Sequence, residues 1–217
     1  CSTINKIKIE LETGIDISSR LSKLIKKFDY DDKMLNDWNI YHFHLSDIDD
    51  IKSGFKKRTG ELLFVYVPFN SDNVYFLDVS KGHKNKTTFC NLNLLDLINK
   101  NWSKLLVPFT LPDGMKPYPC SIKSSKEYLL LRKANINTIL PLKNTNKYIL
   151  SPGFGQTAAG TSAYNQMRTN RVLNTINLLI LEKIIPENIP AKLILIDNFI
   201  YIKNLRRNTF LCKISII

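Results

Sequence analysis

The chain has 217 residues, with 31 Lys and Arg against 19 Asp and Glu, and 44% of its residues are hydrophobic. This apolar content, which includes 9 Tyr, 11 Phe and 2 Trp, is enough to offset the entropy of ordering the chain, so extensive disorder is excluded. Glycine (8) and proline (9) are too scarce for a collagen-like or low-complexity chain. The formal net charge of +12 is the one unusual global property.

The excess positive charge lies in the second half of the chain. Residues 1–110 carry 16 Lys and Arg and 14 Asp and Glu, whereas residues 111–217 carry 15 and 5, a net charge of +10. Because polyanions bind to clustered Lys and Arg, this half is the candidate binding surface. A basic surface kept for solubility, or a drift of composition towards Lys, Asn and Ile, would give the same asymmetry.

The cysteines and the lengths of the apolar runs indicate where in the cell the protein is expected. Cys1, Cys90, Cys120 and Cys212 form no C-x-x-C pair and no Cys/His cluster at zinc-finger spacing, so a structural zinc site is not expected. Four cysteines are too few for a disulfide scaffold, which favours a reduced, cytoplasmic protein. No apolar run reaches 18 residues, so we expect no membrane partner.

Hydrophobic periodicity predicts both strands and helices in the first half. Residues 39–45 alternate so that His42 and His44 lie on one face of a strand. Turn-forming residues at 70–73 separate two apolar runs and predict a hairpin. The expected elements are a strand over 4–11, a helix capped by Ser18 or Ser19 and reaching Phe28, the strand over 39–45, hairpin strands over 61–69 and 74–79, and a helix over 91–101.

The second half begins with a proline-containing stretch and ends in alternating strands. Four prolines lie between residues 108 and 119 and predict a linker. The expected elements beyond it are short strands over 127–132 and 138–142, a glycine-rich segment over 151–160, a long helix over 162–185, and strands over 191–196, 199–202 and 209–216.

These elements predict an α+β fold. We expect an N-terminal mixed α/β sheet domain over residues 1–107, which carries the histidines, followed by the linker over 108–119. Residues 120–217 are expected to form a basic α+β nucleic-acid-binding region with one long helix and a C-terminal β-meander.

The histidines suggest acid–base chemistry on a phosphodiester. If the predicted strands are neighbours, His42, His44 and His83 converge at one end of the sheet. Imidazoles can share general-base and general-acid roles near neutral pH, and Arg58 and Lys84 are available to stabilise a pentacoordinate phosphate. The pattern is typical of metal-independent RNA cleavage through the 2′-hydroxyl, which requires no cofactor.

Two other interpretations use the same histidines. In one, His42 and His44 bind a divalent metal together with Asp47 or Asp78, because a His-x-His strand can present two ligands on one side. In the other, the histidines are structural residues whose hydrogen bonds are satisfied within the fold. No motif of fixed spacing selects between the three interpretations.

The glycine-rich segment over 151–160 lacks the third glycine of a dinucleotide fingerprint and the lysine of a Walker motif. It precedes the long helix, so Gln156 and Thr157 are candidate phosphate donors at the helix N-terminus, and Arg168 and Arg171 lie on the next turns. A flexible loop before an ordinary helix is the alternative.

The tail combines basic and aromatic residues. Lys203, Arg206 and Arg207 surround a predicted hairpin turn, with Phe199 and Tyr201 nearby. Single-stranded nucleic acid stacks on aromatic rings beside cationic groups, so this mixture is a candidate binding surface. A plain solvated turn has the same composition.

The leading hypothesis is a nucleic-acid-binding protein, with RNA favoured over DNA, that cleaves RNA as a toxin-like or defence-like nuclease. The alternative is a non-catalytic RNA- or DNA-binding protein or ribonucleoprotein subunit with structural histidines. A third class is an assembly protein with a protein partner or a second copy, in which the charges are only solvated.

Overall fold

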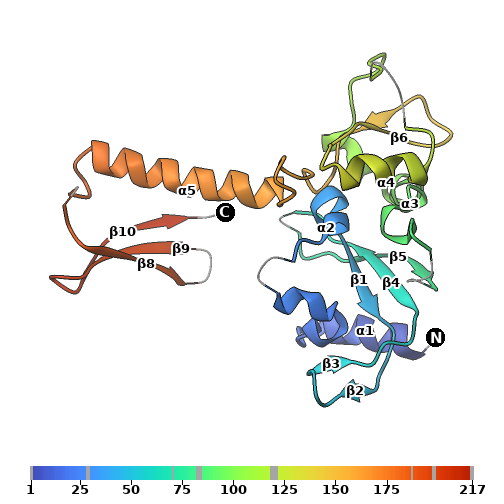
Figure 1. Ribbon diagram of the computed structural model, residues 1–217, viewed down its shortest axis with the longest axis horizontal. Coiled ribbons are helices and arrows are strands. Elements are labelled where there is room, and N and C mark those ends of the chain that lie inside the picture. Colours follow the sequence, from blue (N-terminus) through green and yellow to red (C-terminus); the bar gives the residue numbers. More distant parts are fainter. Residues whose placement is uncertain are drawn as a thin grey trace. The chain divides into compact units, whose positions relative to one another are not determined.

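The computed structural model describes residues 2–27, 30–69, 71–81, 85–117, 122–186, 188–196 and 199–215. The chain has the expected α+β fold and divides into two compact units, Cys1–Ala163 (unit 1) and Tyr164–Ile217 (unit 2) (Figure 1). Within these ranges no helix is both long and apolar enough to cross a membrane.

Unit 1 contains short strands and helices of one to three turns. Its α-helices are α1 (Ser2–Glu12), α2 (Lys33–Trp38), α3 (Asn93–Trp102) and α4 (Ser125–Lys133). Its strands are β1 (Ile40–His44), β2 (Asp49–Asp50), β3 (Phe55–Lys56), β4 (Leu62–Tyr66), β5 (Tyr75–Ser80), β6 (Leu140–Pro141) and β7 (Tyr148–Ile149). Short 3-10 helices lie at Ser18–Arg20, Lys23–Lys26, Thr88–Cys90 and Ser103–Phe109.

The antiparallel sheet β1-β4-β5 separates two apolar cores. The predicted strand over 39–45 and the predicted hairpin are confirmed as β1, β4 and β5. Leu62 and Phe64 face a core that includes α2, α3 and α4. Leu63 and Val65, one residue out of phase, face a second core against α1. This alternation is the two-residue period of a strand buried on both faces.

Two predicted strands are helices, and both predictions were wrong. Residues 4–11 lie in α1, where Ile4, Ile7 and Leu11 form one helical face against the second core, while Ile9 is exposed. An alternation of Ile and Lys over so few residues fits both the two-residue period of a strand and the 3.6-residue period of a helix. Burial of the face formed by Ile4, Ile7 and Leu11 favours the helix. Residues 127–132 lie in α4.

The N-terminus of α4 has a capping signature that the strand prediction missed. The Ser124 hydroxyl accepts from the Glu127 amide at 3.3 Å, and the Glu127 carboxylate accepts from the Lys123 amide at 2.8 Å. These two hydrogen bonds resemble a capping box, except that Glu127 binds the amide before the N-cap residue, and they stabilise the first turn of the helix. The helix expected up to Phe28 is replaced by the 3-10 helices Ser18–Arg20 and Lys23–Lys26, and the strand expected over 138–142 shortens to β6.

A buried carboxylate joins α2 to α4 and to the glycine-rich segment. Asp37 is 2% exposed and accepts hydrogen bonds from the Tyr128 hydroxyl at 2.6 Å, from Arg132 Nε at 2.6 Å and from Gln156 Nε2 at 3.0 Å. Burial, and then the carboxylate of Asp37, raise the pKa of the Tyr128 phenol, so it stays protonated and donates. We call Asp37, Tyr128, Arg132 and Gln156 the Asp37 cluster.

The proline-containing stretch expected to be a linker lies within unit 1, and its described part pairs with β7. The Leu111 amide donates to the Tyr148 carbonyl at 2.8 Å, and the Leu150 amide donates to the Phe109 carbonyl at 2.8 Å. The boundary between the compact units falls at 163/164 instead.

Unit 2 is one helix on a three-stranded meander, as the sequence predicted. Helix α5 (Ala163–Leu181) lies along one face of the sheet β10-β9-β8, formed by β8 (Ala191–Ile196), β9 (Phe199–Asn204) and β10 (Thr209–Ser215) (Figure 1). Ile202 and Ile214 point towards α5 and pack with Ile176, Leu179 and Ile180. Within unit 2, α5 thus covers one face of the sheet, and no other described element of the unit lies on the second face.

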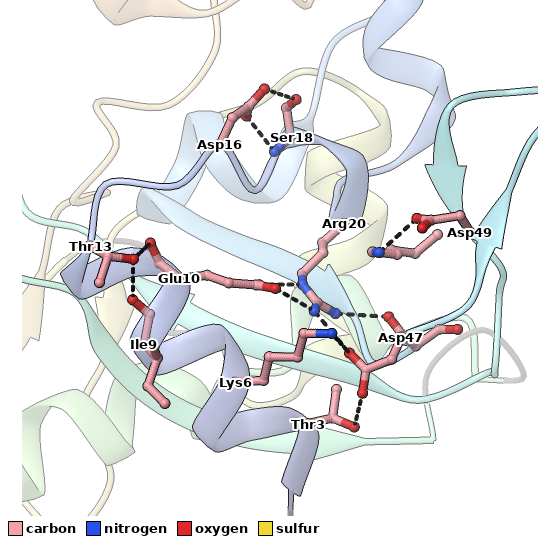
Figure 2. Close-up of polar contacts among 12 residues, drawn as sticks. Thr3, Lys6, Ile9, Glu10, Thr13, Asp16, Ser18, Arg20, Asp47 and Asp49 are labelled. Atoms are coloured by element: carbon pink, nitrogen blue, oxygen red, sulfur yellow. Dashed lines mark hydrogen bonds and ion pairs between the residues drawn. The ribbon is translucent and has the colours of Figure 1, made fainter.

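Arg20 joins α1 to the segment after β1. Its guanidinium is 1% exposed and donates to Glu10 from Nε at 2.8 Å and from Nη2 at 3.1 Å, to the Ser46 carbonyl at 2.8 Å and to Asp47 at 3.0 Å. Figure 2 shows this side chain between Glu10 and Asp47, with Lys6 and Thr3 also contacting Asp47. The bidentate geometry is the strongest form of this ion pair.

We expect Glu10→Gln to lower stability in a pH-dependent way. The hydrogen bonds from Arg20 are the main cause that lowers the pKa of Glu10 below its ordinary value of 4.5. A lowered folded-state pKa stabilises the protein above that value, and this contribution is lost as the pH falls below it. Urea unfolding should show a difference between wild type and variant that is largest at neutral pH and shrinks below pH ~4.5. The matched control Glu12→Gln removes only an exposed pair with Lys8 and should have a small effect at every pH.

Removing Arg132 from the Asp37 cluster should be strongly destabilising. Arg132→Met keeps an unbranched side chain but leaves the buried Asp37 carboxylate without its cation, which typically costs about 3–5 kcal/mol of unfolding free energy. Lys133→Met changes the neighbouring exposed residue of the same helix and should stay within about 0.5 kcal/mol of wild type. Equal midpoints for the two variants in urea unfolding would contradict a structural role for the cluster.

Candidate nucleic-acid interface

The uncovered face of the unit 2 sheet combines aromatic rings with lysines. In β9, alternation places Phe199, Tyr201 and Lys203 on this face, because Ile200 and Ile202 point towards α5. The pairing register places one residue of β8 and one of β10 beside each of them. The three rows are Lys192–Lys203–Phe210, Ile194–Tyr201–Lys213 and Ile196–Phe199–Ser215. We call this surface the aromatic–lysine face.

A β-bulge completes the aromatic–lysine face. The register shifts between Phe210 and Cys212, so Leu211 is the extra residue of β10. Phe210 and Lys213, three residues apart, therefore lie on the same face. In a regular strand they would point to opposite faces.

The rings on this face are close together and are partly covered by lysines. The ring centroids of Tyr201 and Phe210 are 5.4 Å apart. Lys213 Nζ lies 3.5 Å from the Phe199 centroid and 5.6 Å from that of Tyr201, and Lys203 Nζ lies 5.7 Å from that of Phe210. Phe210 is 56% exposed. Exposed cation–π contacts contribute only about 0.5–1 kcal/mol, so a ligand can displace the ammonium groups.

The charge of this surface is positive. The strands β8, β9 and β10 contain no Asp or Glu within the bounds given above. Residues 164–217 carry eight Lys and Arg and three Asp and Glu, a net charge of +5, so half of the +10 found in 111–217 lies in unit 2. Phosphate groups approaching this face meet cations without an opposing carboxylate on the strands.

The turn between β9 and β10 carries two exposed arginines. The side chain of Asn204 is buried, and its oxygen accepts from the Arg206 amide at 2.9 Å and from the Arg207 amide at 3.1 Å. This Asx-type turn fixes the backbone of the two arginines while their side chains stay exposed. Lys203, Arg206 and Arg207, which the sequence grouped together, therefore lie at one end of the aromatic–lysine face.

The structure separates Arg168 and Arg171 from this group. Both lie on α5, which packs against the opposite face of the sheet. Arg168 stacks on Tyr164 at 5.6 Å and lines a groove with Val172, Leu193 and other apolar residues of α5, β8 and β9. The two arginines do not contribute to the aromatic–lysine face.

Gln156 and Thr157, the predicted phosphate donors before α5, form hydrogen bonds to other residues of the fold. Gln156 belongs to the Asp37 cluster, and its backbone exchanges hydrogen bonds with the Asn137 amide group at 2.7 and 2.8 Å. Thr157 bonds to Thr161 through both backbone and hydroxyl, with 2.8 Å between the hydroxyls. A Cβ at Gly153 would collide with the Asn36 carbonyl, so this glycine allows the segment to pack on α2.

The histidines of β1 point into the first core. His42 and His44 are 6% and 2% exposed, and their ring centroids are 6.3 Å apart. His42 Nδ1 lies 3.6 Å from Asp32, and its ring contacts Phe89 at 5.0 Å. The shared face is confirmed, and this degree of burial is typical of structural histidines.

The remaining residues of the catalytic hypothesis lie elsewhere or outside the described residues. His83 and Lys84 fall in the range 82–84, which is not among them. Arg58 is exposed in the loop after β3. Among the residues that the structure describes, no group of three or more His, Cys, Asp or Glu is placed to hold a metal ion. Asp47, a ligand in the metal interpretation, is paired with Arg20.

Comparison with protein-family models, with curated proteins and with solved structures finds no match for the chain.

Sequence reasoning missed Lys192, Phe210 and Lys213 as members of this face. Lys192 lies on β8, and only the pairing register places it beside Lys203. Phe210 and Lys213 share a face because of the bulge, for which the sequence contains no glycine signal. The Phe-x-Tyr-x-Lys alternation of β9 was the one signal that pointed to this surface.

Proposed function

We propose that this protein binds single-stranded nucleic acid, with RNA as the favoured form, on the aromatic–lysine face of β8, β9 and β10, and that it does so without cleaving it. The observation that carries the proposal is the grouping of Phe199, Tyr201 and Phe210 with three lysines on one uncovered sheet face. Bases stack on aromatic rings whatever their sequence, and lysines contact the phosphates between them.

The dimensions of the face support this ligand. Adjacent strands lie about 4.8 Å apart and residues two apart along a strand about 6.6 Å apart, so the three rings cover space for roughly two or three bases. A duplex has its bases stacked within the helix and does not offer their faces to such rings. The proposal is therefore specific to unpaired strands.

The burial of His42 and His44 supports binding rather than catalysis. A general base must come within hydrogen-bonding reach of the substrate proton, and both imidazoles point into the core of unit 1. The strands of the aromatic–lysine face contain no His, Asp or Glu. This arrangement favours the alternative of a non-catalytic binding protein with structural histidines.

Replacing aromatic rings by leucine should weaken binding while leaving the fold intact. Tyr201→Leu and Phe210→Leu keep an apolar side chain but remove the surface for stacking, which contributes about 1–3 kcal/mol per base. We expect affinity for a short fluorescein-labelled RNA, measured by anisotropy, to fall about 5- to 150-fold for each variant. DNA of the same sequence tests the preference for RNA.

The matched control is Phe69→Leu, which changes a half-buried ring that packs on Phe154 in unit 1. It should bind like wild type. The RNA should be recovered intact after each titration. Unchanged affinity in both sheet variants would contradict the proposed surface.

The lysines should account for part of the salt dependence. For single strands, the slope of log affinity against log salt changes by about 0.7 for each phosphate contact. We expect Lys203→Gln and Lys213→Gln each to reduce the magnitude of the slope by about that amount. Lys100→Gln, an exposed substitution in unit 1, should leave the slope unchanged. Parallel lines for all four proteins would show that these lysines do not contact phosphates.

A further inference from the structure

The positive charge is concentrated at one end of the aromatic–lysine face. The row nearest the β9–β10 turn contains Lys192 and Lys203, and the turn itself adds Arg206 and Arg207. The chain before β8 is held at the same end, because the Leu205 amide donates to the Pro190 carbonyl at 2.9 Å. Four cations thus lie at this end, which we call the basic end.

Among the described residues, the opposite end of the face has a single cation. Its row consists of Ile196, Phe199 and Ser215, and only the ammonium of Lys213, from the middle row, reaches over Phe199. A strand crossing the whole face would meet one described cation, Lys213, at this end and four at the basic end. The distribution therefore favours a ligand whose negative charge is concentrated at one end rather than spread evenly along it.

From this asymmetry we infer that the basic end holds a terminal phosphate and that the preferred ligands are single strands ending in a phosphomonoester. A terminal phosphate carries a charge of about −1.5 to −2 at pH 7, against −1 for an internal phosphodiester. It also has three acceptor oxygens, which suit the arginine side chains of the turn. The adjacent bases then stack on Phe210, Tyr201 and Phe199. This inference rests on the proposed function and names its substrate class.

The structure of the turn supports this role for the arginines. Both side chains are exposed, and neither forms an ion pair with another described residue. Their backbone amides are held by Asn204, so the side chains extend from a fixed base. A backbone that is already ordered in this way loses less entropy on binding than a flexible turn would.

The test compares one RNA sequence with a 5′-hydroxyl, a 5′-phosphate or a 3′-phosphate end, by competition against a labelled strand. We expect one phosphorylated form to bind wild type about tenfold more tightly than the unphosphorylated form, as charge-assisted hydrogen bonds would give. The double variant Arg206→Ala, Arg207→Ala should reduce this ratio to near one. The control Lys100→Ala, Lys104→Ala removes the same charge from exposed sites in unit 1 and should preserve the ratio.

The outcomes separate this inference from the proposed function. Equal binding of all three RNAs by wild type would overturn the terminal-phosphate inference and leave single-strand binding in place. Absence of binding to every RNA and to DNA of the same sequence would overturn both. The wild-type ratio decides the inference even if the arginine variant is unstable.

Discussion

The buried carboxylate of Asp37 is the constraint on which the arrangement of unit 1 depends. It accepts from Tyr128, Arg132 and Gln156, which lie 91, 95 and 119 residues further along the chain. A buried charge is tolerated only with such partners, so α2, α4 and the glycine-rich segment must meet at this point. Gln156, which the sequence suggested as a phosphate donor, is therefore a structural residue inside the fold. The positive charge of Arg132 is neutralised by Asp37 and is not available to a ligand.

The sequence predicted correctly those elements whose spacing of apolar residues fits only one type of secondary structure. The strand β1, the hairpin β4–β5 and the meander β8–β9–β10 follow from alternation and turn chemistry. Residues 4–11 fit both periods, and only packing of Ile7 in the second core selects the helix. The linker prediction for 108–119 relied on proline, which is equally compatible with the irregular segment that pairs with β7.

The candidate site was predictable only where it lies within one strand. Phe199, Tyr201 and Lys203 were visible as a local alternation, whereas Lys192 joins them through inter-strand register and Phe210 through the bulge. The burial of His42 and His44 could not be predicted from the sequence for a related reason. Alternation correctly placed His42 and His44 on one face, but whether that face meets solvent or a core depends on α2, α3 and α4, which pack there from distant positions in the chain.

A three-stranded sheet with one helix must leave one face open, and the composition of that face then requires an explanation. Lysines with long apolar stems can cover aromatic rings in water, and Lys213 and Lys203 do so over Phe199 and Phe210. In the proposed complex the bases replace these contacts, and the displaced ammonium groups move the short distance to the phosphates. The same lysines would thus partly cover the rings of the free face and provide the charge that binds the strand, because each ammonium group has a partner in both arrangements.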